Sequence, residues 1–207
     1  MDITFGVPVP DDDEEVPEPI VRTPRLAIRA FRNSDAAALQ RLANNVEVSR
    51  TLSDHFPFPY TAADAEQFLK IALPDNGEYA IFRSSGPDSD EDDVFVGGIK
   101  LSRLPDVYSC GSEVGYWIGR EFWGQGLATE AVIAFSRWAF ESHPDMERLE
   151  GLVYATNMAS SHVLEKAGFT YEGTRRRAAR KRGEITDVLV YGLLRDENEE
   201  ITKTAAR

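Results

Sequence analysis

The sequence is poor in the residues from which disulfides and metal sites are built. It has one cysteine and three histidines. Cys110 alone excludes an intramolecular disulfide, and because no histidine lies near it in sequence to activate it, we expect a buried structural thiol. His55, His143 and His162 show no ligand spacing with Cys110 or with one another, so we expect no metal. Long apolar runs and a charged-then-apolar leader are also missing, so we expect a cytoplasmic protein without a membrane partner.

Basic residues are absent from two segments that hold the whole of the net charge of −12. Residues 1–20 contain seven acids and residues 84–93 contain five, without a single Lys or Arg. Both segments are poor in apolar residues, which is typical of mobile chain. We therefore expect a disordered acidic arm over 1–20, one folded domain over 21–195 and a frayed tail over 196–207.

The pattern between these ends is that of an α/β domain. We expect strands over 26–29, 79–83, 94–102, 112–118, 149–154, 169–174 and 185–194. We expect helices over 33–45, 62–73, 127–142 and 158–167, the second capped by Thr61 and the last ended by Gly168. This order predicts a single-domain, mixed, mostly antiparallel sheet with helices on both faces.

The segment Gly119–Ala131 joins a predicted strand to a predicted helix through two closely spaced glycines, Gly124 and Gly126. A strand, a tight turn and a helix N-terminus direct several backbone N–H groups to one point, which favours a bound phosphate. Leu127 and Ala128 replace the Lys and Ser or Thr of a Walker loop, and the third glycine of the dinucleotide fingerprint is missing. The glycine spacing alone therefore leaves phosphate binding and a plain turn as alternatives.

A second segment, Asn157–Phe169, follows the next predicted strand. The two segments together resemble the GNAT acetyltransferases. Those enzymes pair a Gln/Arg-x-x-Gly-x-Gly/Ala pyrophosphate loop with an Asn-x-x-Ser-x-x-apolar-x-Glu-Lys-x-Gly-Phe segment. Thr23–Arg29 and Gly183–Tyr191 resemble the ribosomal-protein N-terminal (Rim-type) branch. The resemblance implies acetyl-CoA as cosubstrate and a sheet whose central strand pair splays apart.

The resemblance also implies which residues hold acetyl-CoA. Backbone groups of the strand ending at Trp117 and Ile118 would bind the pantetheine arm, with the amide of Asn157 nearby. Asn157 fits equally well as the N-cap of the following helix. Glu121 replaces the Gln or Arg of the family motif, and we expect its carboxylate to point away from the phosphates. The pyrophosphate would then bind the backbone of Gly124, Gln125, Gly126, Leu127, Ala128 and Thr129.

Two residues are candidates for the chemistry. Ser160 matches a family serine placed to give a proton to the departing thiolate, and its alternative role is that of a first-turn helix serine. No tyrosine occupies the alternative acid position later in that helix. Glu113 could accept the proton of the acceptor amine, or could be a strand-end carboxylate in solvent.

We expect direct transfer within a ternary complex, to a peptide N-terminus or a small amine. The acceptor would enter under the loop Phe56–Tyr60 and the helix over 61–73. The alternative is a non-catalytic acyl-CoA-binding or sensing domain. We expect a monomer or homodimer and no nucleic-acid partner, because the basic residues over 175–182 have no interleaved aromatics and fit a solvated hairpin tip.

Overall fold

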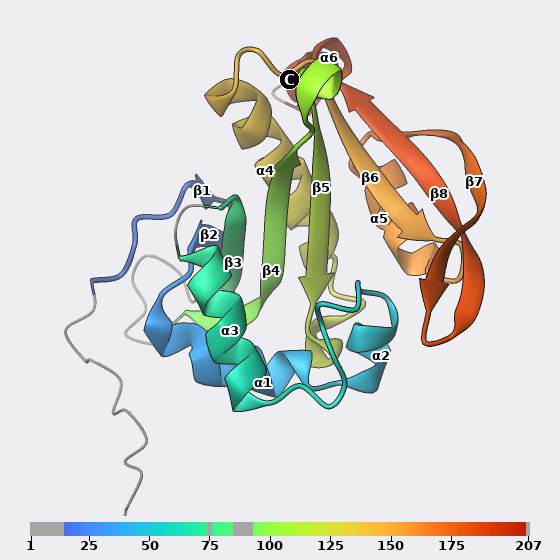
Figure 1. The fold of residues 1–207 in the computed structure, drawn as a ribbon. Helices are drawn as coiled ribbons and strands as arrows, with labels where there is room; N and C mark the ends of the chain where they lie inside the picture. Colours follow the sequence, from blue (N-terminus) through green and yellow to red (C-terminus); the bar gives the residue numbers. More distant parts are fainter. Residues whose placement is uncertain (1–14, 74–75, 85–92, 206–207) are drawn as a thin grey trace, which may run out of the picture.

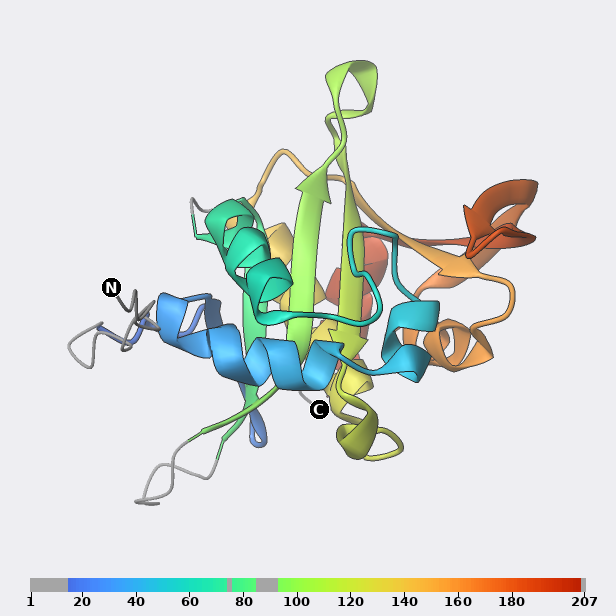
Figure 2. The same cartoon turned by 60° about the horizontal axis from the view of Figure 1, so that its bottom comes forward.

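A computed structural model describes residues 15–73, 76–84 and 93–205. Eight strands form one sheet in the order β1-β2-β3-β4-β5-β6-β8-β7 (Figure 1). They are β1 Val21–Arg22, β2 Leu26–Ala30, β3 Glu78–Arg83, β4 Val94–Arg103, β5 Gly111–Ile118, β6 Arg148–Tyr154, β7 Thr170–Lys181 and β8 Glu184–Leu194. The α-helices are α1 Ala36–Ala43, α2 Val46–Arg50, α3 Ala62–Ala72, α4 Leu127–Ser142, α5 Met158–Lys166 and α6 Arg195–Ala205. Helices α1 to α3 cover one face, and α4 and α5 lie behind the other (Figure 2).

The sheet is split between β5 and β6, its one parallel pair within the described residues. The two strands pair only from Gly111 to Glu113, opposite Arg148 to Glu150, and then diverge (Figure 1). The crossover helix α4 connects them, as a parallel pair requires. The expected mixed sheet with a splayed central pair is therefore confirmed.

Helix α4 begins where the sequence predicts and buries one apolar face against the sheet. Phe135 is fully buried and lies 5.6 Å, between ring centroids, from Tyr79 of β3. Its neighbour Trp138 lies 5.3 Å from the same tyrosine. Aromatic edge contacts of this kind add to the free energy gained by burying apolar area. This packing fixes the direction of α4, and with it the position of the helix N-terminus.

One ion pair is buried beneath the other face. The guanidinium of Arg29 makes two hydrogen bonds to the Asp35 carboxylate, at 2.9 and 2.8 Å, and both residues are at most 5% exposed. Asp35 also accepts the backbone N–H of Arg32 at 3.0 Å, and Arg29 lies over the ring of Phe82 at 4.0 Å. A buried charge needs such partners, because removing one leaves the other without a counter-charge.

Three expectations are wrong. Residues 196–205 form most of α6 instead of a frayed tail, because the Arg195 side chain caps the C-terminal carbonyls of α4 and Ile201 packs beside Gly168. The first helix ends at Ala43, and a separate α2 follows. Cys110 is exposed, since it lies in the turn before β5.

Other expectations are confirmed. Thr61 accepts the N–H of Asp64 as the N-cap of α3, and Gly168 has φ +92° after α5. The closing hairpin turns at Gly183. The acidic arm as far as residue 14 and the acidic loop from 85 to 92 lie outside the described residues.

Candidate active site

The glycine turn presents a row of backbone donors at the N-terminus of α4. Gly124 and Gly126 have φ of +74° and +76°, the left-handed region that favours glycine. Among the hydrogen bonds of the described residues, none has a backbone N–H from Gly124 to Thr129 as its donor. A Cβ built on Gly124 would meet nothing within 4 Å, so the space in front of the turn is open. These donors fit a pyrophosphate group, because the helix dipole adds positive potential there.

A network from the β1–β2 loop braces this turn, and sequence reasoning missed it. Arg25 donates to the carbonyl oxygen of Gln125 at 3.0 Å and, through Nε, to the Glu130 carboxylate at 2.6 Å. Thr23 Oγ1 donates to the other Glu130 oxygen at 2.6 Å. Burial raises the pKa of Glu130, but these hydrogen bonds outweigh it and leave the pKa below its usual value. The turn is thus tied to the start of β2 by an ionised carboxylate.

Glu121 lies as expected for a carboxylate that avoids a phosphate. Its side chain pairs with Arg41 of α1 at 3.0 Å, and it lines neither of the two cavities described below. The pair keeps the negative charge on the α1 side of the turn.

The free edge of β5 faces the split. The N–H of Gly119 bonds to the Val96 carbonyl of β4 at 2.8 Å. Because alternate residues of an antiparallel strand direct their backbone groups to opposite sides, Trp117 directs its N–H and C=O to β4. Tyr116 and Ile118 direct theirs to the β6 side, where the pairing has already ended. Within the predicted strand end, the backbones of Tyr116 and Ile118 therefore face the split, whereas the backbone of Trp117 is directed to β4.

Two details modify this edge further. The indole Nε1 of Trp123 donates to the Ile118 carbonyl at 2.7 Å, so Ile118 offers only its N–H. The Trp117 side chain lies 5.7 Å from the ring of Phe56 and walls both cavities. Trp117 can thus contact a ligand through its ring and not through its backbone.

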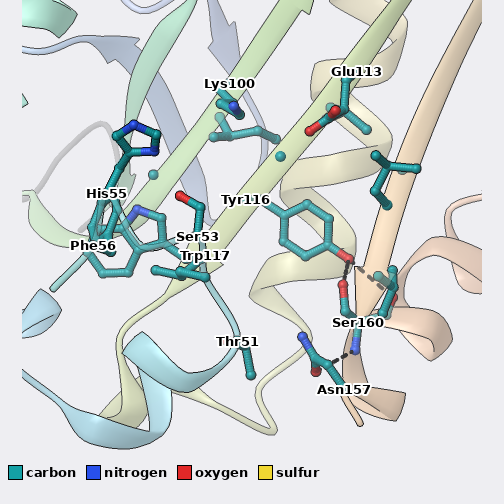
Figure 3. A pocket seen from close by; sticks show the side chains of 18 of the residues that line it. Thr51, Ser53, His55, Phe56, Lys100, Glu113, Tyr116, Trp117, Asn157 and Ser160 are labelled. Atoms are coloured by element: carbon teal, nitrogen blue, oxygen red, sulfur yellow. Dashed lines mark hydrogen bonds between the residues drawn. The ribbon is translucent and has the colours of Figure 1, made fainter. Parts of the chain in front are cut away.

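Helix α5 carries the second predicted group. Asn157 Oδ1 accepts the N–H of Ser160 at 3.3 Å, which confirms its role as N-cap. The Tyr116 hydroxyl lies 2.8 Å from Ser160 Oγ and donates to the Ser160 carbonyl at 3.2 Å (Figure 3). The sequence could not pair Tyr116 with Ser160, because they meet only where β5 faces α5. Burial raises the pKa of Tyr116, which the Ser160 bond only partly offsets, so the phenol stays protonated.

Two cavities meet at this hydroxyl pair. One, of about 820 Å³, extends from the glycine turn along α5. The other, of about 510 Å³, lies under the loop before α3 and reaches β3 and β6. Both are lined by Thr51, Tyr116, Trp117, Asn157 and Ser160. Ligands in the two cavities could therefore touch at Ser160.

The 510 Å³ cavity contains the predicted Glu113 and two charged residues that sequence reasoning missed. Glu78 of β3 stands opposite Lys100 of β4, and Glu113 lies on β5 (Figure 3 labels the last two). Burial raises the pKa of the Glu78 carboxyl above its usual value, and the positive charge of Lys100 offsets part of that effect. Phe56 and His55 cover the same cavity, as expected for the acceptor side.

Metal binding and membrane insertion gain no support. Among the described residues, no cluster of three His, Cys, Asp or Glu side chains is arranged to hold a metal ion. The helices that the structure describes are all too short or too polar to cross a bilayer.

Comparison with known proteins identifies the family. A family model described as an acetyltransferase (GNAT) domain matches residues 25–170. YdaF of Bacillus subtilis, provisionally named a ribosomal N-acetyltransferase, is 29% identical over 175 residues, which is 84% of this chain and 93% of YdaF. The uncharacterized N-acetyltransferase p20 of Bacillus licheniformis is 29% identical over 84% of this chain and 96% of its own. The chain belongs to the GNAT family and is an acetyl-CoA-dependent acetyltransferase.

Solved structures share the fold. A GNAT-family acetyltransferase from Bacillus anthracis superposes with a TM-score of 0.75 at 20% identity and covers 85% of this chain and 98% of its own. RimL, the ribosomal L7/L12 alpha-N-protein acetyltransferase solved with coenzyme A, has a TM-score of 0.73 at 21% identity, covering 87% and 99%. These likenesses support the Rim-type resemblance at the level of the fold.

Proposed function

We propose that this protein transfers the acetyl group of acetyl-CoA directly to an amine, within a complex that holds both substrates at once. The observation that carries the proposal is the meeting of the two cavities at Tyr116 and Ser160. Direct transfer requires the two reactants side by side, and such positioning supplies much of the rate enhancement. The acetyl donor supplies an activated thioester carbonyl.

The protein's own groups divide the remaining tasks. The N–H groups of Gly124 to Thr129 hold the pyrophosphate, and the free edge at Tyr116 and Ile118 holds the pantetheine arm. As the N–C bond forms and the C–S bond breaks, the amine loses one proton and the sulfur gains one. Ser160 Oγ–H supplies the sulfur's proton, because it lies where the cavities join, and Oγ takes a proton back from solvent.

Glu113 is our candidate for the group that takes the amine proton. It lines the 510 Å³ cavity, which we call the acceptor cavity, and does not line the 820 Å³ cavity. This position fits a base that faces the amine and not the thioester. The acceptor is either a peptide N-terminus or a small amine. The printed name of RimL, an alpha-N-protein acetyltransferase, supports the peptide N-terminus.

The test is release of CoA thiol from acetyl-CoA against N-terminal peptides, amino acids, polyamines and aminoglycosides, with the product identified by mass spectrometry. We expect acetylation at the amine and no acetyl-enzyme in a quench without acceptor. An acetylated protein that passes its group to the amine would contradict direct transfer. Tight binding of acetyl-CoA with no amine acetylated would favour the sensing domain.

A further inference from the structure

Lys100 reaches the 510 Å³ cavity from β4. Its stem crosses from β4 over Gly115 of β5, where an added Cβ would lie 2.8 Å from Lys100 Cε. Glycine at 115 therefore leaves room for the lysine. Within the described residues, the Lys100 ammonium has neither a hydrogen bond nor an ion pair, although it lines the 510 Å³ cavity. A half-buried cation without a hydrogen bond or an ion pair in an acceptor cavity is suited to an anionic part of the acceptor.

Two carboxylates accompany the lysine. Glu78 is the cross-strand neighbour of Lys100, and Glu113 lies two residues before Gly115 on the same face of β5. Neither approaches the ammonium within ion-pair distance. The cavity thus presents one positive and two negative groups that are not neutralised by direct contact. An amine that carries its own carboxylate complements this arrangement, since each charge meets its opposite.

We propose that the acceptor is an amine with a carboxylate close to it, and that Lys100 binds this carboxylate while the flanking glutamates face the amine. The proposal rests on the proposed function and names its acceptor class. Two sources have the same chemistry: the α-carboxylate of a free amino acid, and the acidic side chain of a peptide near its N-terminus.

The β7–β8 hairpin provides a second, independent observation. Its tip docks on the rim of the acceptor cavity, where Lys181 Nζ bonds to Asp54 at 2.8 Å and to the Ser53 carbonyl at 3.3 Å. Ser53 lines the cavity. The arginines of this hairpin, namely Arg175, Arg176, Arg177, Arg180 and Arg182, are all exposed. Such a cluster attracts an anionic substrate and raises its association rate at low salt.

The experiment compares acceptors that differ only in charge: free alanine against its α-carboxamide, and amidated tetrapeptides with Asp or Asn at the second position. The kcat/KM for acetyl-CoA-dependent acetylation is measured for each pair. We expect about a tenfold preference for the acidic member of one pair, the size expected of one charge-assisted hydrogen bond. Which pair shows the preference identifies the source of the carboxylate.

Variants assign the preference to Lys100. Lys100→Met should bring the acid-to-amide ratio close to one, and Lys100→Arg should retain part of it. Lys70→Met removes an exposed lysine of α3 and should leave the ratio unchanged. Equal rates for both members of each pair in the wild type, or a preference that survives Lys100→Met, would overturn the proposal.

Calorimetry separates this proposal from the proposed function. The same peptide and amino-acid pairs are titrated into the CoA-bound protein, wild type and Lys100→Met. Binding that is tighter for the acidic members and depends on Lys100 supports the anion subsite even if no amine is acetylated. Binding that ignores the carboxylate refutes the subsite even if acetylation is observed.

Discussion

The contact between Tyr116 and Ser160 makes the sharpest prediction. Tyr116→Phe removes one hydroxyl but keeps the ring and the backbone edge of β5. If the phenol orients Ser160 Oγ through the 2.8 Å hydrogen bond, its loss should lower kcat with little change in the KM for acetyl-CoA. One neutral hydrogen bond contributes about 1 kcal/mol net, which corresponds to roughly a fivefold fall in rate.

A double-mutant cycle shows whether the two hydroxyls act together. Ser160→Ala should lower kcat by roughly 10²–10⁴-fold if Ser160 supplies the proton. In that background Tyr116→Phe should cost almost nothing, because no Oγ remains to be oriented. The matched control is Tyr171→Phe, which removes a hydroxyl bonded to Thr174 Oγ1 at 2.6 Å on the exposed hairpin. It should leave kcat unchanged.

The assay is steady-state CoA release at saturating acceptor, with unfolding followed in parallel to exclude global loss of structure. A fivefold loss in both the wild type and Ser160→Ala would show that Tyr116 acts independently of Ser160. An effect of Tyr116→Phe confined to the KM for acetyl-CoA would place the phenol in cosubstrate binding alone. Either result would refute a proton-donating pair.

Three further predictions concern the turn, the core and the acceptor cavity. Gly126→Ala should weaken acetyl-CoA binding, measured by calorimetry, by more free energy than it removes from folding stability. Gly183→Ala, the control, should cost the same roughly 1–2 kcal/mol of left-handed strain without changing the affinity for acetyl-CoA. An equal affinity of Gly126→Ala and the wild type would show that the segment is a plain turn. Asp35→Ala should lower the free energy of unfolding, measured by urea denaturation, by about 3–5 kcal/mol, because Arg29 stays buried without its counter-charge. A loss below about 1 kcal/mol would show that water replaces the carboxylate. Glu78→Gln should raise the Tm at pH 7, because a carboxyl whose pKa is raised on folding destabilises the protein once the pH exceeds the ordinary carboxyl range. The gain in Tm should therefore vanish in acid, and a gain that is constant with pH would contradict this reasoning.

The local parts of the site could be predicted from the sequence because they depend on neighbours in the chain. Gly124 and Gly126 indicate a left-handed turn, and their φ values confirm it. Asn157 indicates an N-cap, which the bond to Ser160 N–H confirms. Each of these signals acts within about four residues, which is the range over which backbone geometry is specified by sequence.

The residues that sequence reasoning missed are joined across the sheet. Arg25 reaches the turn from the β1–β2 loop, 100 residues earlier. Glu78 and Lys100 become cross-strand neighbours only through the register of β3 and β4. The frayed-tail expectation failed for the same reason, because the capping of α4 by Arg195 joins segments about 50 residues apart. A polar sequence near a chain end reads as disordered unless its distant partners are known.

One strand serves both substrates because side chains alternate along it. On β5, Trp117 packs on Phe56 at the acceptor side, while Tyr116 turns to Ser160 of α5. A one-residue slip would exchange these faces and separate the hydroxyl pair, so the register against β4 determines the chemistry. Glycine at 97 permits that register, since a Cβ there would lie 2.1 Å from the Trp117 carbonyl oxygen. The close approach of the β4 and β5 backbones at Gly97 is therefore a condition for catalysis on the opposite edge of β5.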